Sequence, residues 1–271
     1  MASILLFLSL MFENSKNLIT KSFIMKKLLL AVLSFSAFTT VFAQTNDVKK
    51  KTDWSKIDLS NRANDHFMIQ YGMDGWTNAP DSAQPSGFSR HFNMYAMLDK
   101  PFKTDARFSI GVGLGISSSN MFFSDTYVNL KAASTTLPFT DVSASNSNRF
   151  KKFKMTTVFV EVPLELRYAK NPITPDKGFK AAVGLKVGSL LKAYTKGKDQ
   201  INAAGTSLYG TKYVVKEASK NYINSIRLAA TGRIGFGNVS IDGSYQLTSL
   251  IKTGNGPKIN PYSVGLTLSG L

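Results

Sequence analysis

Residues 159–168, with the sequence FVEVPLELRY, alternate between apolar and charged side chains and decide the fold. Every second residue from Val160 to Tyr168 is apolar, and the positions between them include Glu161, Glu165 and Arg167. On a helix the two sets would scatter around the axis, whereas on a strand a period of two sends them to opposite faces. The stretch therefore predicts a β-strand with one aliphatic and one charged face. Pro163 removes one hydrogen-bond donor from that strand, and we expect a local bulge there.

The same period of two recurs along the chain, most cleanly in RFSIGVGLGIS at 107–117, where aliphatic residues alternate with serine and glycine. The pattern predicts strands about 10 or more residues long, the length that crosses a bilayer at a tilt. Eight such strands are expected, near 65–75, 88–99, 106–118, 154–169, 179–195, 221–236, 239–252 and 261–271. Short and long connections alternate between them, as in outer-membrane barrels. The longest connections are 119–153 and 196–220.

The tightest connection, Gly237-Asn238, suits a two-residue hairpin turn and fixes a register. In that register Arg233 lies opposite Asp242 on the polar face. On the apolar face the same register pairs Ile234 with Ile241 and Leu228 with Leu247. One register that gives both a charge pair and apolar pairs indicates that these two strands are neighbours.

The size of the polar-face residues decides which face is inside. A soluble lipocalin-like barrel would turn its apolar face inward and cover its exterior with long polar side chains. Here the polar face is often small, at Gly111, Gly113, Gly115, Ala182, Gly184 and Gly188. Small residues suit the narrow interior of eight strands. The sequence therefore predicts an all-β, eight-stranded antiparallel up-and-down transmembrane β-barrel with its aliphatic face in lipid.

Aromatic residues are expected in girdles at the two membrane boundaries. Phe108, Tyr168, Phe179 and Phe236 fall at the short-turn ends of their strands, and Tyr222 and Tyr262 at the other rim.

The N-terminal region predicts export. Residues 1–43 contain an upstream extension and then a signal peptide at 25–43, with Lys26 and Lys27 before a short apolar run and Ala43 at the cleavage site. Residues 44–64 form a polar, basic leader, expected in the periplasm, and 65–271 the barrel. Without residues 1–43 the chain keeps 29 basic and 16 acidic side chains, a net charge of +13, which favours an anionic partner. The chain has no cysteine, which excludes disulfides, a thiol nucleophile and a lipid-modified cysteine.

Three stretches carry a family resemblance: FVEVPLELRY, AVGLKVGSLLKAYTKGK at 182–198, and PYSVGLTLSGL at 261–271. They resemble the PorT-like family of small outer-membrane β-barrel proteins, over about Asp65 to Leu271. The resemblance implies a barrel in the cell outer membrane, and the founding member is associated with a protein-secretion apparatus.

Two groups of charged residues are candidate sites. The first is a charge network in the lumen, where buried carboxylates need cationic partners. It comprises Glu161, Glu165, Arg167, Lys180, Lys186, Lys192, Arg227, Arg233 and Asp242. The second is a basic rim that could neutralise lipid phosphates or be merely solvated. It comprises Arg149, Lys151, Lys152, Lys154, Lys196, Lys198, Lys212, Lys216 and Lys220.

Signals for catalysis and cofactors are weak. The only histidines are His66 and His91, too few for a histidine-rich metal site. Ser89 lies two residues before His91 on one strand face, about 6–7 Å away, too far for direct nucleophile activation. The stretch GVGLG lacks the spacing of a nucleotide-binding loop, and Glu161 with Glu165 suits a charge network better than a glycosidase pair. We therefore expect no enzyme activity, no metal and no cofactor.

Three functions remain open from the sequence. The first is a structural, assembly or secretion-accessory barrel whose basic loops contact a partner protein or surface glycolipid. The second is a narrow small-solute channel, which an interior filled by side chains disfavours. The third is a soluble periplasmic binding barrel, and a lipid-modifying hydrolase is a minor alternative. Nucleic acid is excluded as a partner by the predicted export.

Overall fold

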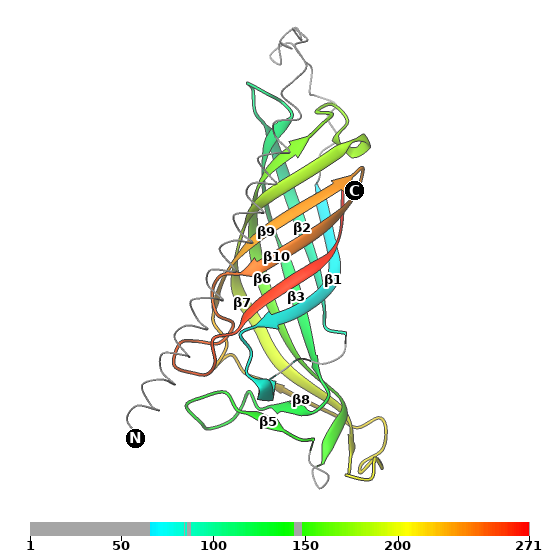
Figure 1. Ribbon diagram of the computed structural model, residues 1–271, viewed down its shortest axis with the longest axis vertical. Helices are drawn as coiled ribbons and strands as arrows, with labels where there is room; N and C mark the ends of the chain where they lie inside the picture. Colours follow the sequence, from blue (N-terminus) through cyan, green and yellow to red (C-terminus); the bar gives the residue numbers. More distant parts are fainter. Residues whose placement is uncertain (1–65, 84, 86–87, 144–147, 271) are drawn as a thin grey trace, which may run out of the picture. The chain divides into compact units, whose positions relative to one another are not determined.

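The described part of the chain forms a closed antiparallel β-barrel of eight strands (Figure 1). The computed structural model describes residues 66–83, 85, 88–143 and 148–270, all within the compact unit Asp53–Leu271. The barrel strands are β1 (Phe67–Thr77), β2 (Arg90–Pro101), β3 (Phe108–Phe123), β6 (Arg149–Ala169), β7 (Phe179–Ile201), β9 (Ile226–Phe236), β10 (Val239–Gln246) and β11 (Asn260–Ser269). Each pairs with its neighbours in chain order, and β1 with β11 closes the ring. The predicted signal peptide and leader lie outside the described residues.

Three further short strands and two 3-10 turns lie between the barrel strands. They are β4 (Thr126–Val128), β5 (Phe139–Asp141), β8 (Val214–Ala218), η2 (Asp81–Ala83) and η3 (Pro175–Lys177). Strands β4 and β5 pair with each other, and β8 adds to the end of β7. No helix in the described ranges is long and apolar enough to span a membrane.

The hairpin register predicted from Gly237-Asn238 is confirmed. Arg233 is the cross-strand partner of Asp242, and Ile234 that of Ile241. Leu247 donates a backbone hydrogen bond to Leu228, which continues the same register. Gly237 adopts a φ of 62°, the left-handed conformation that a primed two-residue turn requires.

The predicted orientation of the two faces is also confirmed. Leu164, Val183 and Ile241 on the aliphatic face are 50%, 62% and 59% exposed, whereas Glu161 and Glu165 are 1% and 2% exposed. An aliphatic exterior around a buried charged interior is the arrangement of a barrel solvated by lipid.

Pro163 does not cause the expected bulge. The pairing of β6 with β3 runs to Val112 opposite Leu164 and resumes at Gly115 opposite Glu161 in an unchanged register. The bulge lies instead in the pairing of β6 with β7, closer to the long loops, where Val158 pairs with Lys192 but Phe159 pairs with Leu190. Leu191 is therefore the extra residue in β7, and the alternation of β7 changes phase there.

Strands β6 and β7, of 21 and 23 residues, are about twice the ~10 residues that cross a bilayer. They continue beyond the other strands at the long-loop end, where β5 and β8 also lie (Figure 1). The expected loops 119–153 and 196–220 are thus partly strand, because β6 and β7 extend into them. The end of β7 also offers a hydrogen-bonding edge, with which β8 pairs.

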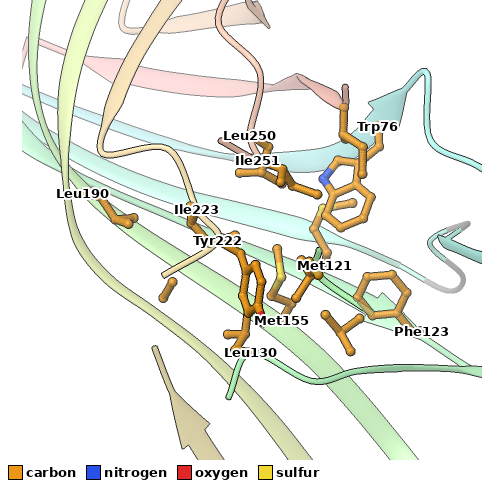
Figure 2. Packing of buried hydrophobic residues seen from close by; sticks show 14 of the residues in the cluster. Trp76, Met121, Phe123, Leu130, Met155, Leu190, Tyr222, Ile223, Leu250 and Ile251 are labelled. Atoms are coloured by element: carbon orange, nitrogen blue, oxygen red, sulfur yellow. The ribbon is translucent and has the colours of Figure 1, made fainter. Parts of the chain in front are cut away.

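At the long-loop end the connections pack into a hydrophobic cluster, the loop core (Figure 2). Tyr222 and Ile223, expected in a strand from 221, and Leu250 and Ile251, expected in a strand to 252, belong to this cluster instead. Tyr222 was predicted in the rim girdle and is buried, where its hydroxyl donates to the carbonyl oxygen of Ala132 at 2.6 Å. The loop core contains Trp76, Met121, Phe123, Val128, Leu130, Leu137, Phe153, Met155, Phe159, Leu190, Ala193, Tyr222, Ile223, Leu250, Ile251 and Ile259.

The girdle at the short-turn end has the predicted positions. The rings of Phe108 and Tyr168 are 5.2 Å apart, and those of Tyr168 and Phe179 are 6.4 Å apart. Phe236 is the cross-strand partner of Phe179, which extends the aromatic row over four strands. Tyr262 is exposed on the wall toward the other rim.

Candidate functional site

The part of the lumen near the short turns holds a layer of ion pairs centred on Glu165. Arg167 Nε and Arg233 Nη2 both donate to Glu165 Oε2, at 2.8 and 3.1 Å. Arg167 Nη1 also reaches Asp99 Oδ1 at 3.5 Å, and Ser109 Oγ donates to the same oxygen at 2.7 Å. These groups come from four strands, so the layer ties the wall together across the lumen.

A second layer is centred on Glu161. Tyr95 donates its hydroxyl hydrogen to Glu161 Oε2 at 2.7 Å, and Arg227 Nη1 lies 2.9 Å from Oε1. Lys186 Nζ donates to Gln70 Oε1 at 2.8 Å and lies 5.1 Å from the centre of the Tyr95 ring. Packed glycines make room for these side chains, since a Cβ at Gly115 would lie 2.5 Å from the Tyr95 ring.

Charge inside the lumen is balanced over the described residues. The buried or half-buried carboxylates are Asp74, Asp99, Glu161, Glu165 and Asp242, and the cations are Arg167, Lys180, Lys186, Arg227 and Arg233. Lys180 Nζ donates to Ser269 Oγ at 2.9 Å. An interior with matched charge and direct contacts braces the barrel and presents no excess charge to a permeating ion.

Lys192 was predicted in the lumen, and this prediction is wrong. Leu191 and Lys192 are both exposed, because the bulge turns the chain by one residue there. Lys192 consequently lies on the outer wall, with its Nζ 5.9 Å from the Tyr194 ring.

The bulge creates a basic surface on the outside of the extended strands. Beyond it, Lys196 is the direct cross-strand partner of both Lys154 and Lys216. Lys152 and Lys198 form the next like-charged pair. We call the outer basic face the set Arg90, Lys152, Lys154, Lys192, Lys196, Lys198 and Lys216.

Arg90, which the sequence analysis missed, belongs to this face because β2 and β3 bring it beside β6. It pairs with Asn120, whose Oδ1 accepts a hydrogen bond from Lys154 Nζ at 2.7 Å. Burial, and then the nearby charges of Lys196, Arg90 and Lys216, lower the pKa of Lys154. Three cations thus act on Lys154, and in the described strands no carboxylate shares their face.

The remaining residues of the predicted basic rim lie elsewhere on the extension. Lys151, Lys212 and Lys220 are exposed but do not belong to the outer basic face. Arg149 is half-buried at the start of β6. The nearest acidic side chain on β8, Glu217, faces the other side, where Tyr127 donates its hydroxyl hydrogen to Glu217 at 3.2 Å.

Ser89 and His91 lie on the same side of the chain, as the strand pattern predicted, and both are buried, but each has a different partner. Ser89 Oγ accepts a hydrogen bond from the backbone nitrogen of Phe122 at 3.0 Å, and His91 Nδ1 lies 2.8 Å from Asp74 Oδ1. Ser119 donates to the other oxygen of Asp74. Within the described ranges no group of three or more histidine, aspartate or glutamate side chains could hold a metal ion.

The sequence was compared with protein families and with known proteins. Residues 42–268 match the family described as "Outer membrane protein beta-barrel domain". No curated protein matches the sequence significantly.

Solved structures similar to the chain include three small outer-membrane proteins. Ail, the attachment invasion locus protein of Yersinia pestis, in complex with sucrose octasulfate, is 12% identical, with 75% of this chain and 96% of that chain covered and a TM-score of 0.30. Neisserial surface protein A is also 12% identical, with the same coverage and a TM-score of 0.34. The outer membrane enzyme PagL is 9% identical, covering 74% of this chain and 98% of that chain, with a TM-score of 0.35.

Proposed function

The chain belongs to the outer membrane protein β-barrel domain family, and on that premise we propose that it is a non-enzymatic barrel that binds the anionic glycolipid of the outer leaflet. The outer basic face carries this proposal. Its lysines directly oppose one another across β6, β7 and β8. Like charges directly opposite on a sheet destabilise it, so an anion bound between them would offset the repulsion.

The position of the outer basic face fits a lipid headgroup. The row of exposed aliphatic residues on β7 comprises Val183, Leu185, Val187 and Leu191. Lys192, the first lysine of the outer basic face on β7, follows directly after this row. A lipid whose acyl chains lie on the aliphatic wall would place its phosphates at the height of the lysines. Basic residues near an anionic membrane surface contribute about 1 kcal/mol each to binding.

Glycolipid retention during purification tests this function. The full chain, extracted from its own outer membrane in mild detergent, is expected to retain glycolipid phosphate. The triple variant K154Q/K196Q/K216Q should lose about 3 kcal/mol of binding, a roughly 100-fold weaker retention. The matched control K103Q/K170Q/K177Q removes three exposed lysines at the other end of the barrel and should retain glycolipid normally. Equal retention by the two triple variants would reject the proposal.

The geometry around Ser89 supports the non-enzymatic part of the proposal. Nucleophilic catalysis needs a hydroxyl within hydrogen-bond reach of its base. His91 instead contacts the carboxylate of Asp74. The nearby hydroxyl of Ser119 donates its hydrogen bond to the same carboxylate and not to His91. Incubating the purified barrel with phospholipid and glycolipid and finding released fatty acid, lost in H91A, would contradict this part.

A secretion-accessory role is a second candidate, suggested by the resemblance to PorT-like barrels and by the free edge of β8. In the described sheet β8 pairs only with β7, so its other edge can accept a strand from a partner protein. A photo-crosslinker at Val215 should then capture one protein in intact cells, whereas the same probe at Val183 in the lipid-facing wall should not.

A further inference from the structure

A second concave site lies on the extension, between the β4–β5 hairpin and the ends of β6 and β7. Its cavity volume is ≈ 260 Å³. Its lining combines aromatic rings with polar side chains, namely Tyr127, Asn148, Arg149, Phe150, Phe153 and Gln200 among others. We refer to it as the tip pocket. It is distinct from the outer basic face, whose lysines do not line it.

The aromatic part of the tip pocket is a continuous apolar wall. The rings of Phe150 and Phe153 are 6.0 Å apart and nearly parallel, and the Tyr127 ring lies 5.1 Å from that of Phe153. Gly197 permits this arrangement, because a Cβ there would lie 2.6 Å from the Phe150 ring. Phe153 is buried against Phe123 of the loop core, whereas Tyr127 and Phe150 keep part of their surface free.

Tyr127 is held in place from the other side. Its hydroxyl donates to Glu217 of β8, which fixes the ring as part of the wall. Burial, and then the charge of Glu217, raise the pKa of Tyr127, so the hydroxyl remains protonated and able to donate at physiological pH. Pre-organised rings of this kind offer a flat surface at little entropic cost.

Hydrogen-bonding groups also line the tip pocket. In the described chain the side chains of Asn148, Arg149 and Gln200 make no hydrogen bond or ion pair, although Arg149 and Gln200 are half-buried. Amide groups supply donors and acceptors together, as neighbouring hydroxyls require, and the guanidinium supplies a fork that matches a carboxylate. Among the described residues that line the pocket there is no carboxylate.

We propose that the tip pocket binds one uronic-acid residue of an acidic surface glycan. The axial C–H bonds of a sugar ring pack on the aromatic wall, the amides of Asn148 and Gln200 take its hydroxyls, and Arg149 takes its carboxylate. The volume is just below the ~300 Å³ at which ordinary small-molecule sites begin, which limits the occupant to about one ring. This site adds recognition of sugar to the binding of phosphate proposed for the outer basic face.

Saturation-transfer NMR on the full chain in lipid nanodiscs tests the proposal, with methyl β-D-glucuronide and methyl β-D-glucoside as probes. The glucuronide should bind at least about tenfold more tightly than the glucoside, because only it satisfies Arg149. R149Q should abolish that difference, and F150L should weaken both probes at least about tenfold. Equal binding of the two probes, or unchanged glucuronide binding by R149Q and F150L, would overturn the proposal.

Matched variants separate this site from general effects. K212Q removes an exposed cation from the β7–β8 connection, and F102L truncates a ring in the turn between β2 and β3, so neither should alter glucuronide binding. K154Q/K196Q/K216Q should also bind the glucuronide normally while losing glycolipid. Loss of glucuronide binding in that triple variant would show that the lysines, and not the tip pocket, hold the sugar.

Discussion

At the scale of single residues, Glu161 shows how the lumen is stabilised. It is 1% exposed and contacts both Tyr95 and Arg227. E161Q keeps the shape but leaves the charges of Arg227 and Lys186 uncompensated, and breaking a buried pair in this way costs about 3–5 kcal/mol. Guanidinium unfolding of the barrel in lipid vesicles should show that loss. Y95F removes one hydrogen bond to a charged group, worth about 1.5–3 kcal/mol, and should cost less. A smaller effect for E161Q than for Y95F would mean that Arg227 finds another partner.

Gly115 illustrates the close packing that the sequence pattern predicted for the lumen. A Cβ there would lie 2.1 Å from the carbonyl oxygen of Met94, whereas at Gly232 the nearest atom is 3.9 Å away. Overpacking costs about 1–3 kcal/mol, so G115A should lower the free energy of unfolding while G232A leaves it nearly unchanged. The comparison is matched because both glycines have ordinary φ angles and lie in barrel strands. Equal tolerance would indicate a wall that adjusts by more than the packed contacts suggest.

Lys154 gives the outer basic face a specific pH dependence. Its pKa is lowered, first by burial and then by the surrounding cations, from the ordinary value of 10.5. A lysine with a lowered pKa loses its positive charge at a lower pH than a solvated lysine does. Glycolipid affinity should therefore begin to fall at a pH below the ordinary lysine value of 10.5, and K154Q should remove that first step. A titration of affinity that is identical in wild type and K154Q would exclude Lys154 from the site.

At the scale of elements, alternation predicted the strands well wherever one face is lipid and the other lumen. Near the long loops the strand pattern was extended too far, because Tyr222, Ile223, Leu250 and Ile251 are consecutive apolar pairs that pack into the loop core. The bulge at Leu191 could not be foreseen either, since it is defined by pairing with β6 and leaves no turn residue in the sequence. That one-residue shift is why Lys192 lies outside and why Lys196 lies opposite Lys154.

The opposed lysines predict a conflict between stability and binding. In K196E the new carboxylate lies between Lys154 and Lys216, its direct partners on both sides. Opposite-charge pairs contribute about 0.2–1 kcal/mol each, so K196E should unfold at higher denaturant concentration than wild type. Glycolipid retention should fall, because the anion site is now occupied by the protein's own charge. A variant that is both less stable and fully competent to retain glycolipid would refute this account of the face.

At the scale of the whole molecule, the fold class was predictable because three independent features agreed: the period of two, the alternating loop lengths and the small inward residues. The sites were less predictable. The two basic clusters lie 42 or more residues apart in sequence, from Lys154 to Lys196, and only the β6–β7 pairing places them side by side. The tip pocket had no sequence signal, since its rings and amides come from three segments joined by tertiary contacts.

The layers of the molecule lead to a prediction about ion conduction. Ions entering from the long-loop end would meet the loop core, in which Ile223, Leu130 and Ile259 are fully buried. Deeper in the lumen they would meet the two ion-paired layers centred on Glu161 and Glu165. Eight strands leave an interior that side chains fill, so planar-bilayer recordings should show insertion without conductance steps. The double variant E165A/R167A removes only the ion pairs of the layer centred on Glu165. It should also show no conductance steps, because the loop core still fills the long-loop end. Steady steps from the wild-type barrel would instead require the loop core to move aside, and would favour the solute-channel hypothesis over glycolipid binding.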